Sequence, residues 1–445
     1  TPANGNGTLT YQWQRSTVGC SGPWTNISGA VGATYDPPII TQTTYYQVRI
    51  TSTLNSVGCV AFSNCIEVTN YAKSWLGTAN SDWDNPTNWQ PSGVPTSNHC
   101  VAIPNVTNDP IINGTNYQAF ANTLTIHSNG KLQIASGNSI TVTGTVTVNN
   151  NGQFELLNNA SLIQIDNVMN NGNIIYRRIA SGIKGGDYVY WSSPISNFNV
   201  NAISPLTPSA FILKWNPTIA NANSGLGNWI SAANEIMMPA TGYIVRGPDN
   251  FTTTAQNFTA NFVNGTPNNG VITTAISRGN FTGGSYNGTN GAQITRFDDN
   301  WNLVGNPYPS AIRALDFLNL NTNIEGAIRL WTHTNLPSSA ISSPFYGTTQ
   351  SNYTPADYIT YNGLGTVSGP AGFNGFIAGG QGFFVQMNDG ATATQNITFN
   401  NSLRSATYAN NQFYRNAEEN ENSDLVASRI WLDIIDSANN SDRTL

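Results

Sequence analysis

Two segments in the second half of the chain decide the fold: Trp301-Asn-Leu-Val-Gly-Asn-Pro-Tyr-Pro-Ser-Ala-Ile312 and Gly379-Gly-Gln-Gly-Phe-Phe-Val-Gln386. Each joins a short apolar run of the β type to a stretch that has to turn. Pro307 and Pro309 have no N–H to give to a strand ladder, and glycine readily adopts positive φ. Neither segment contains a nucleophile, a general base or a cluster of metal ligands. Both therefore predict strands joined by tight turns rather than a catalytic centre.

The composition of the 445-residue chain favours the same interpretation. Charged residues make up only 9% of it, against roughly 25% in an average soluble protein. Its 41 glycines and 11% aromatic residues accompany abundant Asn, Thr and Ser. Many short strands with uncharged outer faces have this composition, whereas a disordered chain carries more charge and fewer aromatics. The length predicts about two to four domains.

Charge and hydropathy exclude two classes of partner. The net charge is −6 and no basic run is longer than Arg177-Arg178, so the chain has no patch that could follow nucleic-acid phosphates. No apolar stretch reaches the roughly 18 residues of a membrane span. The chain starts at Thr1 without Met and ends at Leu445 within a strand-like pattern, which indicates a mature or truncated piece of a longer protein.

Residues 1–70 have the strand pattern of an immunoglobulin-like sandwich. Apolar alternation predicts strands at Thr10–Gln14, Thr43–Ile50 and Ser63–Thr69, with turns between them. This series resembles the immunoglobulin-like repeats of long bacterial surface adhesins. The resemblance implies that Trp13 lies in the core and that the domain is incomplete at its N-terminus.

Four cysteines in the first quarter of the chain predict two disulfides rather than buried free thiols. They are Cys20, Cys59, Cys65 and Cys100, and their spacing fits no zinc pattern. Three pairings are possible. In the sandwich that the resemblance implies, Cys59 and Cys65 flank the last hairpin and Cys20 lies at the other end. We therefore expect Cys59–Cys65 to close the hairpin and Cys20–Cys100 to tie this domain to its neighbour.

Residues 71–180 change to a short repeat of strand and turn. Their opening, Trp75–Trp89, resembles a tryptophan-rich module that precedes β-solenoid-like stretches in secreted bacterial proteins. Apolar pairs then recur from Leu124 to Ile165, with first members 8, 8, 6, 8 and 8 residues apart, separated by turns such as Asn151-Gly152. This spacing fits a small β-helix with about three strands per coil or a tight meander, and its regularity favours the solenoid.

Residues 181–416 are predicted to form one large, jelly-roll-like β-sandwich, which makes the whole chain all-β. Its strands begin at Asp187–Ile195, and its one credible helix, Ser310–Leu318, would be capped by Ser310. Residues 417–445 contain an acidic linker and the start of a further C-terminal domain, with a strand at Arg429–Ile435.

The sequence holds no recognisable catalytic or cofactor-binding constellation. Its three histidines lie outside any HExxH pattern, and no GxSxG motif occurs. Asp298-Asp299 is the one carboxylate pair beside an aromatic residue, but adjacent strand residues point to opposite faces, so a turn is the better interpretation. Asp82 and Asp84 share a face and could bind Ca²⁺, although two carboxylates without a third ligand are a weak site. We therefore expect no enzyme, no resident metal and no cofactor.

Aromatic residues offer a second kind of site, because their faces stack on sugar rings. The candidates for stacking on a glycan lie in or near loop-rich stretches and are Trp229, Trp331, Tyr346 and Tyr353. The alternative, which the fold class favours, is that such residues fill the core of a sandwich.

Residues 301–312 and 379–386 resemble segments that recur near the C-terminal ends of large surface proteins. Gliding Gram-negative bacteria export these proteins through the type IX secretion system, and the modules at 1–70 and 71–180 also resemble parts of them. The resemblance implies an extracellular location at the cell surface, attached to the outer membrane or secreted, with the export machinery as a passing partner. Asp436-Ser437-Ala438 resembles the O-glycosylation site of the same bacteria, with Ser437 as the acceptor.

Three functions are compatible with this resemblance. The first is a non-enzymatic protein of adhesion or surface structure, because stiffness and reach need no chemistry. Its lasting partners would be surface glycans or other copies of itself. The second is a subunit of an extracellular filament, assembled through edge strands. The third is an accessory region of a secreted polysaccharide-degrading enzyme, whose catalytic domain would precede Thr1.

Overall fold

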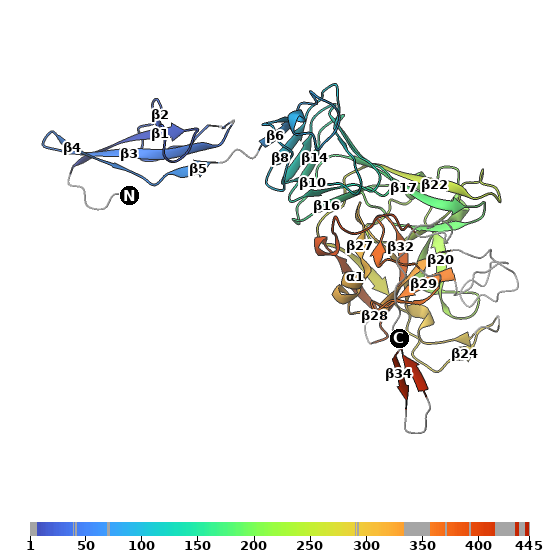
Figure 1. Ribbon diagram of the computed structural model, residues 1–445. Helices are drawn as coiled ribbons and strands as arrows, with labels where there is room; N and C mark the ends of the chain where they lie inside the picture. Colours follow the sequence, from blue (N-terminus) through green and yellow to red (C-terminus); the bar gives the residue numbers. More distant parts are fainter. Residues whose placement is uncertain are drawn as a thin grey trace.

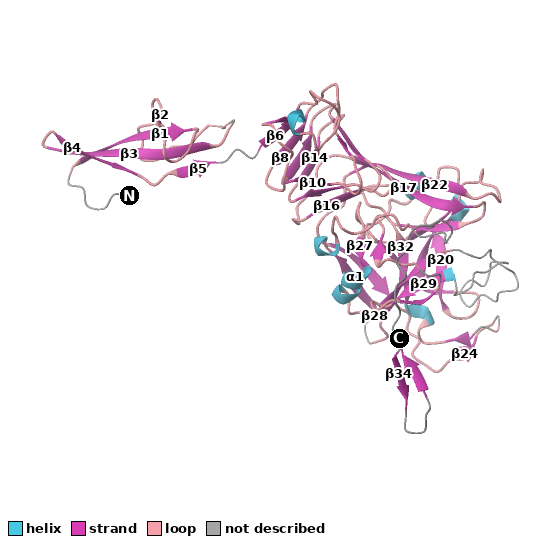
Figure 2. Cartoon of the chain, viewed as in Figure 1, coloured by secondary structure: helices cyan, strands magenta, loops and turns pink. Residues whose placement is uncertain are grey.

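The computed structural model describes residues 7–38, 40, 42–68, 72–289, 291, 293–332, 357–369, 372–390 and 393–413, and the backbone of two strands at 432–435 and 441–444. The protein is nearly all β, which confirms the predicted class (Figures 1 and 2). Among the described residues the one α-helix is α1 (Ala314–Leu320). It begins later than predicted and Ser310 does not cap it, because Ile312–Arg313 form strand β27 instead.

The N-terminal part is one five-stranded antiparallel sheet. Its order is β2-β1-β3-β4, and β5 continues the β4 edge along β3. The strands are β1 (Thr8–Ser16), β2 (Thr25–Asn26), β3 (Thr44–Leu54), β4 (Val57–Phe62) and β5 (Ile66–Val68). The segment after β2 covers one face: Trp13 donates from its indole N–H to the carbonyl of Gly32 (3.0 Å), and its ring lies 5.8 Å from that of Tyr35. Within residues 7–68 that are described, no second sheet completes a sandwich.

The expected disulfide pairing is wrong. Cys20 is bonded to Cys65, with their Cα atoms 5.7 Å apart, and Cys59 and Cys100 are free and exposed. The reason lies in the order of the strands. The end of β1 and the start of β5 both pair with the first residues of β3, around Tyr46, so Cys20 and Cys65 meet at the same end of the sheet.

Residues 72–183 form a three-sided parallel β-solenoid of about four turns, which confirms the solenoid and rules out the meander. Strands of successive turns pair in parallel on each side, in the orders β8-β11-β14, β9-β12-β15-β17 and β10-β13-β16. The strands are β6 (Ala72–Trp75), β7 (Trp89–Gln90), β8 (Cys100–Ile103), β9 (Ile111–Ile112), β10 (Gln118–Ala121), β11 (Thr123–Ile126), β12 (Lys131–Ile134), β13 (Ser139–Val142), β14 (Val146–Val148), β15 (Gln153–Leu156), β16 (Ser161–Gln164) and β17 (Ile174–Ile183).

Repeated turns at the corners explain why the chain coils instead of folding back. Asn129 and Asn151 occupy the same corner of successive turns with φ of 62° and 61°, and Asn116, Gly137 and Asn159 occupy another with φ of 54°, 76° and 67°. Asparagine and glycine tolerate this left-handed conformation better than other residues. The Asn-Gly pairs are therefore corners of the solenoid and not hairpin turns.

Three tryptophans close the first turn of the solenoid. Trp75, Trp83 and Trp89 are almost completely buried, and the ring of Trp89 lies edge-on to both others at 5.0 and 4.7 Å. The indole N–H of Trp75 donates to the carbonyl of Asn108 (2.7 Å) and that of Trp89 to the carbonyl of Trp83 (2.8 Å). This cluster covers apolar surface that would otherwise face water.

The rest of the body is built on two packed sheets. One has the order β18-β21-β19-β20 and the other β26-β32-β28-β29-β30. Their strands are β18 (Tyr188–Trp191), β19 (Ile212–Ala220), β20 (Leu226–Ser231), β21 (Tyr243–Arg246), β26 (Trp301–Gly305), β28 (Ile324–Trp331), β29 (Tyr358–Tyr361), β30 (Thr366–Ser368) and β32 (Gly382–Met387). The two segments that open the sequence analysis are neighbours here, because β26 and β32 pair along their whole length from Trp301↔Gln386 to Gly305↔Gly382.

The remaining strands form shorter pairings around these sheets. Strand β22 (Gln256–Gly265) pairs with β17. Four two-stranded antiparallel pairs are also described: β23 (Ile272–Ser277) with β33 (Thr394–Phe399), β24 (Tyr286–Asn287) with β25 (Gln293–Ile294), β27 with β31 (Phe376–Ile377), and β34 (Leu432–Ile435) with β35 (Ser441–Thr444). Within the described residues, 3-10 turns lie at η1 (Pro86–Asn88), η2 (Val200–Ile203), η3 (Ser209–Phe211), η4 (Asp298–Asn300) and η6 (Asn401–Leu403). The acidic linker at 417–424 lies outside the described residues.

One buried core joins the solenoid to the β18-β21-β19-β20 sheet. It begins at Trp75, fills the solenoid, continues under β18 and β21 and reaches Phe413. The boundary that the sequence places after residue 180 falls inside β17, which ends at Ile183. The solenoid and the sheet that contains β18 and β21 therefore share their apolar interior.

Candidate functional site

The carboxylate pair beside Trp301 is engaged by the backbone. Asp298 accepts a hydrogen bond from the N–H of Thr295 (2.6 Å) and Asp299 from that of Phe281 (3.2 Å). Burial raises the pKa of both carboxyls, and at Asp299 the nearby Asp389 raises it further while Arg278 lowers it. The two side chains therefore bond to different loops, Asp298 within its own turn and Asp299 to the loop at Phe281.

The other polar candidates lie in turns. The Asp82 carboxylate accepts from the side-chain amide of Asn80 (2.8 Å), and Asp84 is exposed beside it. His99 accepts at Nδ1 from the backbone N–H of Thr96 (2.9 Å), while His127 follows β11 at a corner of the solenoid. In the part of the chain that the structure describes, no three His, Cys, Asp or Glu residues gather as metal ligands would.

The tryptophans proposed for glycan stacking lie in an aromatic layer between the two sheets. Its members are Tyr188, Tyr190, Trp215, Trp229, Trp301, Trp331, Tyr358 and Phe384. Trp331 is only 4% exposed, so its proposed stacking on a glycan is wrong: its ring lies edge-on against Tyr190 at 5.0 Å. Trp229 is half-buried and packs edge-on against Trp215 at 5.1 Å. Tyr346, Tyr353 and Ser437 lie outside the described residues.

A buried arginine bonds the solenoid to the sheets. Arg404 donates from Nη2 to the carbonyl of Leu162 in β16 (2.5 Å) and from Nε to the hydroxyl of Ser310 (2.9 Å). It also donates from Nη1 to the amide oxygens of Asn269 and Asn401 and lies over the ring of Tyr308 at 4.5 Å. Burial lowers the pKa of Arg404 to about 10. The groups around the guanidinium are neutral oxygens and the face of an aromatic ring, which stabilise the cation.

A second buried arginine repeats this arrangement. Arg178, on β17, donates to the side chain of Asn159 (3.3 Å) and to the carbonyl of Asn410 (2.7 Å), and it lies over the ring of Phe413. The side-chain amide of Asn410 donates to the carbonyl of Ala160 in the solenoid (2.7 Å). Since buried polar groups are costly when unpaired, these bonds hold the solenoid and the sheets in one relative position.

The two opening segments belong to this junction. The carbonyl of Pro309 accepts from the N–H of Leu162 and so continues the solenoid beyond β16 (2.9 Å). Asn306 donates to three carbonyls, those of Ser310, Ile377 and Ala378. A Cβ at Gly379 would lie 2.5 Å from the Tyr176 hydroxyl, so only glycine fits there. Their turn-forming residues are therefore parts of the joint between two β-structures.

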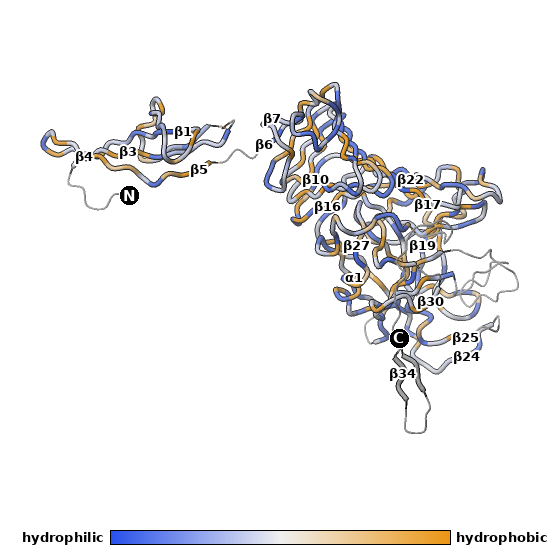
Figure 3. The backbone as a smooth tube through the Cα atoms, viewed as in Figure 1, coloured by the Kyte–Doolittle hydropathy of each residue, from blue (hydrophilic) through white to orange (hydrophobic). Residues whose placement is uncertain are grey.

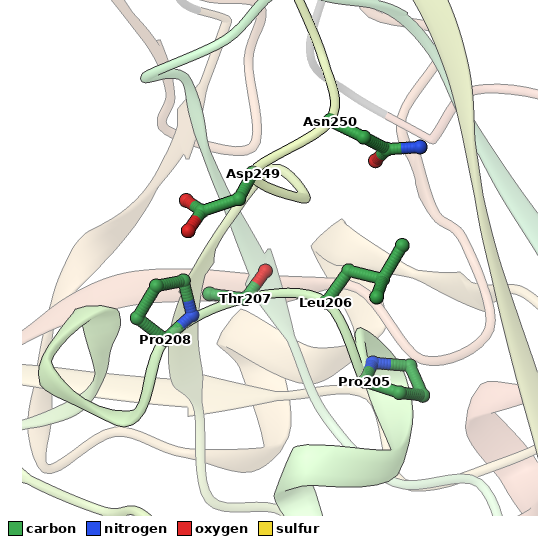
Figure 4. A pocket seen from close by; sticks show the side chains of 6 residues that line it. All are labelled: Pro205, Leu206, Thr207, Pro208, Asp249 and Asn250. Atoms are coloured by element: carbon green, nitrogen blue, oxygen red, sulfur yellow. The ribbon is translucent and has the colours of Figure 1, made fainter.

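A shallow hollow lies beside η3 (Figure 4). It measures about 550 Å³ and is lined by Pro205, Leu206, Thr207, Pro208, Asp249 and Asn250. Its two reactive groups are already engaged: the Thr207 hydroxyl donates to the carbonyl of Arg246 (2.7 Å), and the Asp249 carboxylate is paired with the Arg246 guanidinium. Both groups are therefore held by Arg246, and the Asn250 side chain is the other polar group of the lining.

Strand β4 is an exposed apolar edge. It forms the outer margin of the N-terminal sheet and all six of its residues are exposed, including Val57 (69%), Val60 (46%) and Phe62 (57%). Figure 3 shows this hairpin in the hydrophobic colour. Its sequence, Val-Gly-Cys-Val-Ala-Phe, contains no charge that would oppose pairing with another strand.

A groove of about 560 Å³ lies along β23. Its lining is uncharged and consists of Met238, Pro239, Thr241, Asn268, Asn269, Val271, Ile272, Thr273, Thr274 and Ala275. Two of the apolar side chains on its rim, Met238 (61%) and Val271 (56%), are exposed. β4 and this groove are the two surfaces best suited to contacts with another polypeptide.

Sequence reasoning found neither the junction nor these two surfaces. Arg404 stands among polar residues, and nothing in its surroundings marks it as buried. Arg178 is flanked by apolar residues such as Tyr176 and Ile179, but its charge argues against a buried position. For β4 a usable signal existed, because Val57–Phe62 is an uncharged, β-type run next to a turn at Asn55-Ser56.

Comparisons with known families assign the chain to two adjacent models. The family described as Domain of unknown function (DUF8693) matches residues 74–445, and the one described as Domain of unknown function (DUF8696) matches residues 1–71. No curated protein and no solved structure matches the chain. The two models meet where the N-terminal sheet gives way to the solenoid. No helix of the described residues is long and apolar enough to cross a membrane.

Proposed function

The chain belongs to the DUF8693 family, and we propose that it is a non-enzymatic module of a secreted cell-surface protein, acting in adhesion or surface structure. The observation that carries this proposal is the junction around Arg404. It joins two β-structures into one body, which is what a spacer or scaffold requires and a catalytic cleft does not.

Two further observations support an extracellular setting. The Cys20–Cys65 bond is of a kind that persists in oxidising compartments. Charged residues make up only 9% of the whole sequence, which suits a β-rich surface of uncharged polar side chains. Export by the type IX system remains a proposal that rests on the resemblance of residues 301–312 and 379–386.

Electron microscopy of material sheared from the native cell surface tests this function. With an antibody against the solenoid, we expect label on surface structures, and cells that lack the type IX machinery are expected to lose it. Label confined to the cell interior would contradict the proposal. Turnover of a polysaccharide by the purified protein would favour the accessory-enzyme alternative instead.

A filament subunit is the second candidate function, and one observation favours it. Strand β4 exposes an uncharged, apolar edge on a sheet with few buried side chains. Monomeric proteins protect such edges, since an open edge pairs readily with another strand. In the same micrographs, filaments with a constant axial repeat would favour this function over a single adhesive rod.

A further inference from the structure

The outer edge of β23 is closed at both ends and open in the middle. At one end Ser277 exchanges two hydrogen bonds with the side chain of Asn302 (2.9 and 2.8 Å). At the other end the N–H of Val271 donates to the side chain of Asn167 (3.2 Å). The backbone N–H of the next residue, Arg278, points to the other side of the strand, because it donates to the carbonyl of Ala393, next to β33.

Strand geometry extends this alternation to the residues between. Backbone groups of successive residues point to opposite sides of a strand within the sheet, so Thr273 and Ala275 point away from β33, as Ser277 does. Within the described residues, neither has a hydrogen-bond partner on that side. Their N–H and C=O groups therefore face the uncharged groove of about 560 Å³.

Strand β4 presents the matching half. The two-residue turn Asn55-Ser56, with φ of 52° and 68°, pairs Leu54 with Val57. The N–H of Ser63 donates to the carbonyl of Val48 on β3. The backbone N–H and C=O groups of the odd-numbered residues of β4 therefore also point toward β3. Gly58, Val60 and Phe62 consequently point their backbone groups outward, along an edge with no charged side chain.

We propose that β4 of one copy of this chain pairs with the open edge of β23 in a second copy. This inference rests on the second proposed function, a filament subunit, and names a second copy of the chain as its partner. Both surfaces are uncharged, both have unpaired strand groups, and both carry exposed apolar side chains, which are the requirements of strand addition. Because the two surfaces differ, the contact is heterologous and repeats from copy to copy.

Proline substitutions test the contact without touching the inner ladders. Val60→Pro removes an outward N–H of β4, and Ala275→Pro removes an outward N–H of β23. Val60→Thr and Ala275→Ser keep those N–H groups and are the matched controls. Sedimentation velocity of the full chain over a concentration series measures association, and circular dichroism confirms that each variant is folded.

We expect the wild type and both controls to associate as concentration rises. Each proline variant is expected to need about tenfold or more protein for the same degree of association. Mixed together, the two proline variants are expected to form a one-to-one complex and no larger species, because one keeps a groove and the other keeps an edge.

A mixture that stays monomeric, or a Val60→Pro chain that assembles like the wild type, would overturn the proposal. So would a wild-type chain that is monomeric at every concentration. If that monomer is still found on the native cell surface, the pairing is wrong while the surface function stands.

Discussion

The N-terminal sheet and the body from Trp75 to Phe413 are stabilised in different ways. Among residues 7–68 that are described, the buried apolar side chains are only those of Ala30, Tyr46 and Val48. The body has several large clusters of buried apolar side chains and a junction of buried arginines and asparagines. A sheet with so little core needs a cross-link or a covering partner, whereas the body needs neither. The stability of the sheet is therefore expected to depend on the disulfide far more than that of the body.

The largest expected effect is the difference in stability loss between two tryptophan substitutions, one in each region. Trp89→Ala in the body removes a side chain that is 1% exposed and is expected to cost about 3–5 kcal/mol of unfolding free energy. Trp13→Ala in the sheet removes a half-buried ring and is expected to cost about 1–2 kcal/mol. Urea denaturation followed by circular dichroism measures both. Equal losses would show that the sheet has a larger core than described.

The disulfide gives the next effect, confined to the sheet. Cys20→Ser opens a loop of 45 residues and is expected to lower the stability of the sheet by about 2–4 kcal/mol. The melting temperature of the body is expected to stay unchanged. Cys59→Ser is the matched control, because that thiol is free and exposed. A non-reducing peptide map that joins Cys20 to any other cysteine would contradict the pairing.

Arg404→Met tests the junction. It removes the hydrogen bonds that Arg404 donates to the carbonyl of Leu162 and to the side chains of Ser310, Asn269 and Asn401, and we expect a loss of about 2–3 kcal/mol of unfolding free energy. Arg404→Lys keeps the charge but not the planar fork and is expected to fall between this variant and the wild type. Differential scanning calorimetry checks both. Wild-type stability in Arg404→Met would remove the junction from the account.

The smallest effect is a pH dependence within the body. Burial raises the pKa of Asp299 above its ordinary value of 3.8, so the folded protein takes up this proton before the unfolded chain does. As the pH falls from 7 toward 4, the wild type is therefore expected to gain stability relative to Asp299→Asn. Urea midpoints at several pH values measure the difference. A difference that shrinks or is constant with falling pH would show that the carboxyl is not buried as described.

The sequence predicted what depends on local spacing and missed what depends on pairing between distant segments. The spacing of Leu124, Leu132 and Ile140 contains the period of the solenoid, and all three side chains are buried in it. The partners of Cys20 and Arg404 depend on which strand ends meet, and neighbouring residues do not encode that. The burial of Trp331 also depends on distant segments, because the sequence around a tryptophan is the same whether its ring is exposed to solvent or packed in a core.

Hydrogen exchange across the intact chain tests most directly the claim that the solenoid and the sheets are one unit with a separate N-terminal sheet. We expect amides of β12 and β32 to share one opening free energy, and amides of β3 to open at a lower one. If β12 and β32 open independently, with different free energies, the junction does not couple the two structures and the account of a single rigid body is wrong.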